Sequence, residues 1–236
     1  MLDGLLWLVI PTYNEADSLP VLLARVFKAM PGISVLIVDD NSPDGTGQLV
    51  EKLRKQYSQL HILHRAGKLG IGSAYQEGFA YVLSRGAEVV IQMDADLSHQ
   101  PEDIPRLVQA IEGGAEVVIG SRRIKGGKII GWGPHRHLMS WSAGTLGRLL
   151  LGLKIKDITA GFRVYTKKAM QAVPWNKIKS NGYAWLEEVL YLCNKADLKI
   201  VEVPVVFEDR KSGKSKLGGK SIVEFFLTIF RLRFGG

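Results

Sequence analysis

Short apolar runs rich in valine and isoleucine alternate with segments of helical periodicity through the first half of the chain. Each run is too short for a stable helix and is typical of a buried strand. The expected strands are residues 5–10, 35–38, 61–63, 89–93 and 117–119, and the expected helices are residues 18–30, 45–57, 73–85 and 102–111. This order predicts right-handed βαβ units. We therefore expect an α/β fold with a mostly parallel central sheet and helices on both of its faces.

Polar clusters follow three of these strands, at residues 11–15, 39–45 and 94–96. Ligands of parallel sheets collect at the carboxyl ends of the strands, so the clusters are expected to converge on one crevice. In extended geometry Asp94 and Asp96 would point to the same side, and paired carboxylates suit a hard divalent cation that also binds substrate phosphates. The structural alternative is an Asx turn ahead of the helix that follows Pro101.

Two familiar nucleotide-binding motifs are excluded by their spacing. Gly70-Ile71-Gly72 begins like the dinucleotide-binding fingerprint, but Tyr75 occupies the place of its third glycine. The stretch from Gly213 resembles a phosphate-binding loop, but an extra Gly219 precedes Lys220.

Composition removes several other classes of protein. With 46% hydrophobic and 23% charged residues in 236, the chain can bury a sizeable core and is not a disordered segment. The single cysteine, Cys193, excludes an intramolecular disulfide framework. The first apolar run is too short for a signal peptide, so we expect a cytoplasmic chain without a transmembrane span.

Charge is distributed unequally along the chain. Residues 1–119 hold nine basic and fifteen acidic side chains, whereas residues 120–236 hold twenty-two basic and eight acidic side chains. The net charge of the whole chain is +8. A strongly basic half predicts a polyanionic partner: nucleotide phosphates, nucleic acid or an anionic membrane surface. A solvated basic face would give the same pattern.

The second half is less regular. We expect a loop over residues 120–134, helices over 138–153, 184–196 and 221–233, a strand over 200–207 and a polar loop over 208–216. Basic side chains suited to phosphate oxygens gather at 120–136 without an intervening acid: Arg122, Arg123, Lys125, Lys128 and Arg136. Trp132, Trp141 and a long aliphatic segment beside them favour a membrane interface over nucleic acid, with a core helix as the alternative.

The terminal helix carries one narrow polar stripe of Glu224, Thr228 and Arg231, and apolar side chains cover the rest. Its length of roughly 18 Å is too short to cross a hydrocarbon core of roughly 30 Å. The helix must therefore be buried in the protein, in a partner or in the membrane interface.

Six ordered motifs resemble one enzyme family. Residues 9–15, 38–46 and 93–99 are similar to family 2 inverting glycosyltransferases of the GT-A fold. Residues 120–122, 157–163 and 207–216 narrow the resemblance to the dolichol-phosphate (polyprenol-phosphate) mannosyltransferases. The resemblance implies one GT-A domain over residues 1–220, followed by an amphipathic helix at 221–236 that faces a membrane or a partner.

The resemblance also assigns roles to residues. Donor-binding positions would be Pro11, Tyr13, Glu15, Asp39, Asp40, Asp94, Ala95, Asp96, Arg210 and Lys216. Asp94 and Asp96 would hold Mg²⁺ or Mn²⁺, with Ser98 at a position where some relatives have a glutamine ligand. Arg122 and Arg136 would bind the lipid phosphate and, with the two aspartates, form the catalytic set.

The implied reaction moves mannose from GDP-mannose to a polyprenyl phosphate at the cytoplasmic membrane face. Implied partners are the nucleotide-sugar donor, the lipid acceptor, an anionic membrane surface and a small membrane-anchoring subunit, with no nucleic acid. A phosphate monoester with a second pKa of about 6 is mostly dianionic near neutrality and needs no general base, which agrees with the excess of basic residues. The alternatives are hexosyl transfer from UDP-glucose or a related donor and, from another class, a non-enzymatic basic adaptor.

Overall fold

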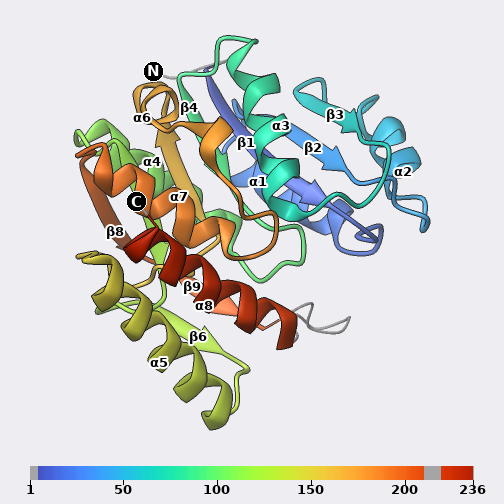
Figure 1. Ribbon diagram of the computed structural model, residues 1–236. Coiled ribbons are helices and arrows are strands. Elements are labelled where there is room, and N and C mark those ends of the chain that lie inside the picture. Colours follow the sequence, from blue (N-terminus) through green and yellow to red (C-terminus); the bar gives the residue numbers. More distant parts are fainter. Residues whose placement is uncertain (1–4, 210–218, 236) are drawn as a thin grey trace.

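A seven-stranded sheet forms the centre of the computed structural model, which describes residues 5–209 and 219–235 (Figure 1). The strand order is β3-β2-β1-β4-β7-β5-β8. The strands are β1 (Leu6–Thr12), β2 (Ser34–Asp39), β3 (Leu60–His64), β4 (Val89–Gln92), β5 (Val117–Ser121), β7 (Arg163–Thr166) and β8 (Ile200–Pro204). All five strands expected in the first half are present.

The sheet is mostly parallel, as predicted, with one exception. β7 runs antiparallel to both of its neighbours, β4 and β5. The sequence analysis missed this strand, whose four residues begin at the charged Arg163. The strand expected over 200–207 is divided at Val205 into β8 and β9 (Val206–Glu208), and β9 pairs with β6 (Lys128–Ile130) inside the segment expected to be a loop.

Helices cover both faces of the sheet because successive residues of a strand point to opposite sides. Leu8 and Ile10 of β1 join the core cluster beneath α1 (Leu19–Ala29), α2 (Thr46–Leu53) and α4 (Ile104–Glu112). Trp7 and Val9 face the opposite cluster, beneath α3 (Ile71–Leu83), α6 (Lys167–Ala172) and α7 (Trp185–Lys195). Short 3-10 helices occupy Pro101–Asp103 and Trp175–Lys177.

The helices α5 (Pro134–Leu151) and α8 (Gly219–Phe234) pack side by side along one side of the molecule, at the bottom of Figure 1. α5 begins four residues before the expected start, with Pro134 as its first residue, a position where the missing N–H costs nothing. The two helices approach closely at Gly147, where an added Cβ would lie 2.5 Å from Ile229 Cδ1. Ile229 is itself part of the core, so α8 is anchored to the domain.

The polar stripe of α8 faces the protein. Glu224 accepts a hydrogen bond from the backbone N–H of Gly182, Thr228 bonds Ser180, and Arg231 forms an ion pair with Glu188 at 2.8 Å. Ile229 packs inward beside this stripe, whereas Phe226, Leu227 and Phe230 on the other side of α8 are exposed. Within the described ranges, no helix is both long enough and apolar enough to span a membrane.

Candidate functional site

The three predicted polar clusters meet at one edge of the sheet. β2 and β4 both pair in parallel with β1, so the loops after these three strands leave the sheet on the same side. Backbone and hydroxyl contacts join the first two loops: Asn14 N–H donates to Ser42 Oγ at 3.1 Å, and Glu15 N–H donates to Thr46 Oγ1 at 3.0 Å. The convergence expected from the strand pattern is therefore present.

Each of these three loops contains a residue other than glycine with a positive φ. Asn14, Asn41 and Leu97 have φ values of 60°, 54° and 63°. A leucine rarely adopts this region, because its Cβ crowds the neighbouring backbone. Strained backbone gathered at one sheet edge is typical of a functional site, where the surrounding packing imposes the conformation.

Among the predicted nucleotide-binding residues, Asp39 and Asp40 have different surroundings. Asp39 accepts hydrogen bonds from Thr12 and Ser42, so its buried carboxylate ties the first two loops together. Asp40 is paired with Arg65, which lies at the end of the neighbouring strand β3. The sequence analysis had not singled out Arg65.

The remaining donor positions lie around the same edge. Pro11 belongs to β1, and the Lys68 ammonium lies 4.4 Å from the centre of the Tyr13 ring. Glu15 Oε2 accepts a hydrogen bond from Ser18, and Ala95 is buried. Arg210 and Lys216 lie outside the described residues.

β4 ends at Gln92, so Asp94 lies beyond the strand and Asp96 lies in the bend that follows it. The prediction that strand geometry aligns the two carboxylates was therefore wrong. Asp96 instead accepts a hydrogen bond from the backbone N–H of Ser98 at 3.0 Å. The Asp94 carboxylate contacts Tyr75 of α3 and His99, which lies further along the same loop.

Two buried side chains contact the opposite oxygens of the Asp94 carboxylate. The Tyr75 hydroxyl donates to Oδ1 at 3.3 Å, and His99 Nε2 lies 3.5 Å from Oδ2. Burial, followed by the nearby Asp94 charge, raises the pKa of Tyr75 well above its usual value, so the phenol remains a donor. Gly161 completes the enclosure, because an added Cβ there would lie 3.2 Å from Asp94 Oδ2.

The donor atoms around this bend fit a hard divalent cation. Two carboxylates are present, and the buried Ser98 Oγ has no hydrogen-bond partner among the described residues. The described residues contain no group of three His, Cys, Asp or Glu side chains placed to hold a metal. A cation held by two protein carboxylates and completed by substrate phosphates and water is the arrangement usual for Mg²⁺.

The Arg122 guanidinium, predicted to bind the lipid phosphate, forms a buried pair with Asp157. Arg122 Nε and Nη2 donate to the two carboxylate oxygens at 2.8 and 2.7 Å, and Nη2 also donates to Thr159. Burial alone would raise the pKa of Asp157, but the Arg122 charge holds it below its usual value. The sequence analysis did not foresee this partner, which lies 35 residues away.

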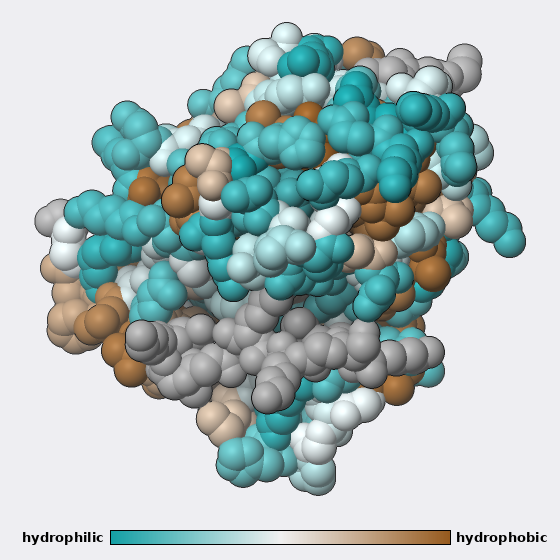
Figure 2. All heavy atoms as spheres, turned by 90° about the vertical axis from the view of Figure 1, so that its right-hand side faces the viewer, coloured by the Kyte–Doolittle hydropathy of each residue, from teal (hydrophilic) through white to brown (hydrophobic). Residues whose placement is uncertain are grey.

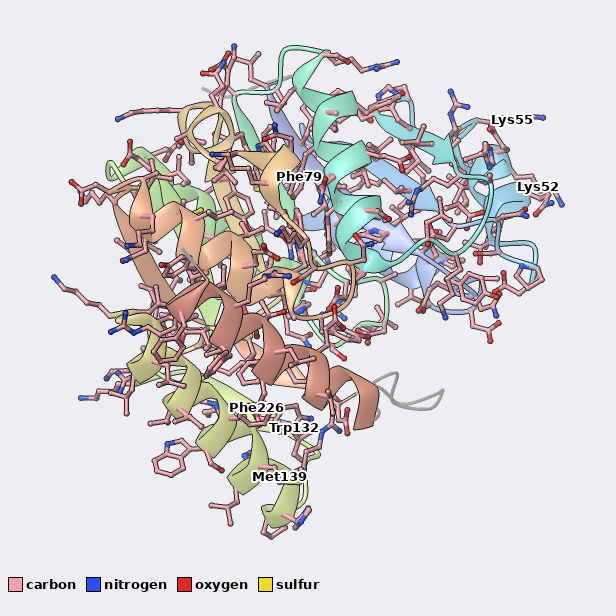
Figure 3. The ribbon with its side chains drawn as sticks, in the orientation of Figure 1. Lys52, Lys55, Phe79, Trp132, Met139 and Phe226 are labelled. Carbon is pink, nitrogen blue, oxygen red and sulfur yellow. The ribbon has the colours of Figure 1, made fainter. Side chains whose placement is uncertain are left out.

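The Arg136 guanidinium, on the first turn of α5, pairs with Asp209 at 2.6 Å and lies 4.1 Å from the Trp132 ring centre. Trp132 also packs edge-on against Phe207, which in turn packs against His99. These three rings connect the two arginines to the bend that carries Asp94. Figure 3 shows Trp132 at the side of the molecule formed by α5 and α8.

The glycine pair excluded as a dinucleotide motif has a packing role. Gly72 N–H donates to the backbone oxygen of Asn181, and an added Cβ on Gly70 would lie 2.7 Å from that oxygen. Gly70 also has a φ of 102°. The glycines let the start of α3 approach the segment before α7.

The fold and this site define an α/β protein whose polar loops and carboxylates meet at one edge of the sheet, and comparison with known proteins gives the family. The chain belongs to glycosyl transferase family 2, whose model matches residues 7–173, and it is a glycosyltransferase. It is 43% identical to the undecaprenyl-phosphate mannosyltransferase of Micrococcus luteus, covering 94% of this chain and 91% of that one. It is 41% identical to the polyprenol monophosphomannose synthase of Mycolicibacterium smegmatis, covering 94% and 84%.

A third relative is the dolichol-phosphate mannosyltransferase of Pyrococcus furiosus. It is 39% identical, and the match covers 95% of this chain but 62% of that longer protein.

Solved structures confirm the GT-A fold. Glucosyl-3-phosphoglycerate synthase of Mycobacterium tuberculosis aligns with a TM-score of 0.67 at 16% identity, covering 97% of this chain and 79% of that one. A mannosyltransferase from Pyrobaculum calidifontis, solved with GDP-mannose and Mn²⁺, aligns with a TM-score of 0.63 at 14% identity, covering 96% and 63%.

Proposed function

We propose that this glycosyltransferase moves mannose from GDP-mannose to a polyprenyl phosphate, with inversion at the anomeric carbon and with Mg²⁺ or Mn²⁺ as cofactor. The observation that carries the proposal is the meeting of the Asp94–Asp96 bend with the Arg122 and Arg136 cluster through packed aromatic rings. The names of three relatives at 39–43% identity support mannose as the sugar and a polyprenyl phosphate as the acceptor.

On the donor side, the loops after β1 and β2 would hold the nucleotide. Tyr13, Glu15 and Asp40 lie there, Pro11 lies near the end of β1, and Asp39 fixes the two loops against each other. Asp94 and Asp96 would hold the divalent cation on the diphosphate, with Ser98 beside them. When bound, the cation offsets negative charge that develops on the departing nucleoside diphosphate.

On the acceptor side, the arginines would bind and orient the lipid phosphate. This phosphate is itself the nucleophile, so the protein must place it in line with the anomeric carbon and need not remove a proton. Arg122 keeps Nη1 for this task, because Asp157 and Thr159 engage only Nε and Nη2. The acceptor phosphate would replace Asp209 as the partner of the Arg136 guanidinium, since guanidinium groups bind phosphate by charge-assisted hydrogen bonds.

The direct test is transfer of radiolabelled sugar into the organic phase. The purified chain is supplied with polyprenyl phosphate in detergent micelles and with either GDP-mannose or UDP-glucose. Labelled lipid from GDP-mannose is expected, and a clear preference for UDP-glucose would favour the hexosyl alternative. Failure to transfer or hydrolyse either donor would favour the non-enzymatic adaptor.

Replacement of Arg136 by alanine is expected to impair use of the lipid acceptor. The apparent KM for polyprenyl phosphate should rise, or kcat should fall, by about tenfold or more, because one charge-assisted contact is lost. The affinity for GDP, measured by calorimetry, should change much less. Lys167→Ala is a matched control, because its half-exposed partner Glu88 precedes β4, at the opposite end of that strand from Asp94. A collapse of GDP affinity would place Arg136 in the donor site instead.

We also propose that α5 and α8 form a face that docks on an anionic membrane. Of fifteen large hydrophobic side chains that are exposed in the described chain, eleven lie on these two helices: Leu138, Met139, Trp141, Leu146, Leu149, Leu150, Val223, Phe226, Leu227, Phe230 and Phe234. Phe226 and Met139 lie on the same lower side of the molecule (Figure 3), and hydrophilic residues cover most of the face seen in Figure 2. Such a concentration of apolar surface marks an interaction site.

The inward direction of the polar stripe supports this proposal. A surface helix in water normally keeps its polar side chains outward. In α8 the polar residues Glu224, Thr228 and Arg231 make internal contacts beside the buried Ile229, and large apolar side chains are left exposed. Burial of the outward side chains at about 25 cal/mol per Å², with about 1 kcal/mol for each nearby basic residue, gives reversible attachment. We also propose a small membrane-anchoring subunit, implied by the family resemblance, as a partner of this chain.

Substitution of both Leu227 and Phe230 by serine is expected to weaken vesicle binding at least about tenfold, because two exposed apolar side chains are removed. Co-sedimentation with phosphatidylglycerol-containing vesicles measures the effect. Val21→Ser on α1, also about half exposed, should leave binding unchanged. Deletion of residues 222–236 is a poorer test, since it also removes Ile229 from the core. Unaltered vesicle binding by the double variant would contradict the proposed face.

A further inference from the structure

A hollow of about 180 Å³ opens between α5 and the segment that precedes β7. Arg122 and Arg136 do not line the hollow, and both lie against Trp132. The hollow adjoins Arg122 through Asp157 and Thr159, which line it and accept hydrogen bonds from the Arg122 guanidinium. Its lining includes three cationic side chains, Arg123, Arg148 and Lys156. No role has been assigned to these three residues by the proposed reaction.

The charge in this hollow is poorly balanced. Asp157 is the one acidic residue among the lining side chains, and its oxygens are already engaged by Arg122. Within the described part of the chain, none of the three cations forms an ion pair. Burial lowers the pKa of Arg123, and the neighbouring Arg122 adds to this despite Asp157. An anion bound here would therefore relieve repulsion between cations.

The shape and polarity of the hollow suit a phosphate group. Ser140, which accepts a hydrogen bond from Arg123 Nη2 at 2.9 Å, and Thr145 supply hydroxyl groups to the wall. Gly144 leaves room in the wall, because an added Cβ would meet no atom within 4 Å. A volume equal to that of about six liquid waters accommodates a phosphate with part of a glycerol.

The location of the hollow indicates the source of this phosphate. Trp141 lines the hollow and is itself more than half exposed on α5, within the apolar face described above. Indole side chains favour the level of the lipid headgroups. We propose that Arg123, Arg148 and Lys156 form a binding pocket for the phosphodiester headgroup of an anionic phospholipid, distinct from the acceptor site. This proposal rests on the membrane-docking part of the proposed function.

The test compares three variants of the full chain. Arg148→Gln with Lys156→Gln removes two charges from the pocket. Gly144→Leu fills the pocket and keeps every charge. Lys125→Gln with Lys154→Gln removes two exposed charges that do not line it. Binding is measured to phosphatidylglycerol-containing vesicles by co-sedimentation, and to dihexanoyl phosphatidylglycerol below its micellar concentration by NMR titration. Inorganic phosphate is titrated in parallel, and circular dichroism checks folding.

We expect the variant with Arg148→Gln and Lys156→Gln to bind vesicles about 30-fold more weakly than the wild type. This variant and Gly144→Leu should both lose the NMR response to dihexanoyl phosphatidylglycerol. The Lys125 and Lys154 control should keep that response. An equal NMR loss in this control, or an unchanged response in Gly144→Leu, would show diffuse attraction and overturn the pocket. Inorganic phosphate binding without phosphatidylglycerol binding would overturn the headgroup assignment. None of these assays uses the sugar donor, so failure of mannosyl transfer in micelles is a separate result.

Discussion

Substitution of Asp96 by asparagine is expected to lower glycosyl transfer at least about 100-fold while the fold is retained. The change keeps the size of the side chain and its capacity to accept the hydrogen bond from Ser98 N–H. It removes one of the two carboxylate charges that the bend offers to a cation on the donor diphosphate. The loss therefore falls on stabilisation of the charge that develops on the leaving group.

Three measurements test this expectation. Transfer should be measured across a range of Mn²⁺ concentrations, binding of Mn²⁺ by electron paramagnetic resonance, and stability by thermal unfolding. Asp197→Asn is the matched control, because it removes a carboxylate near the start of β8, at the opposite edge of the sheet, where φ is 53° and asparagine is tolerated. Full wild-type activity in excess chelator would rule out the cation site at Asp94 and Asp96.

Removal of the Asp157 carboxylate by substitution with leucine is expected to destabilise the protein by about 3–5 kcal/mol. Arg122 would then carry a charge in a buried position, where its side chain is 7% exposed, without the bidentate partner present in the wild type. For a chain of this size the loss should lower the melting temperature by about 6–20 °C. Differential scanning calorimetry measures the shift.

A double variant separates stability from function at the same pair. Arg122→Met with Asp157→Leu removes both charges and should recover much of the lost stability, because an apolar pair of similar volume replaces the ion pair. Transfer activity should stay low in the double variant, since the acceptor phosphate loses Arg122. Asp157→Asn tests the charge alone. A destabilisation below about 1 kcal/mol in the single leucine variant would contradict the role given to this buried pair.

The sequence predicted the parts of the fold that depend on local pattern. Strands and helices of the first half followed from periodicity, and the meeting of the polar loops followed from parallel pairing. β7 escaped prediction because four residues that begin with a charged side chain do not resemble a buried strand. In the structure, Arg163 is fully buried and donates to the backbone oxygens of Ile158, Ala160 and Leu186, contacts that only the tertiary fold supplies.

The same limit applies to the site. Asp94 and Asp96 could be singled out from their spacing. The contacts of Asp94 with Tyr75 of α3 and with His99, which packs against Phe207, could not be predicted in this way. The stripe on α8 was visible in the sequence, but the direction it faces was not. Periodicity shows that a helix has two unlike sides, and only the packing of α8 against its neighbours decides which side meets solvent.

One consequence concerns α5, which carries both Arg136, the proposed acceptor-binding arginine, and part of the apolar face. Arg136 lies in its first turn, and Trp141 follows at about 8 Å further along the helix axis. Contact with α8 at Gly147 holds α5 in place, so in the proposed membrane-docked state the depth of α5 in the lipid would also set the height of the Arg136 guanidinium above the acyl chains. The apolar side chains would then set the position of Arg136 along the membrane normal, and with it the distance from Arg136 to the lipid phosphate. A thicker or thinner headgroup layer would alter catalysis without any change in the site itself.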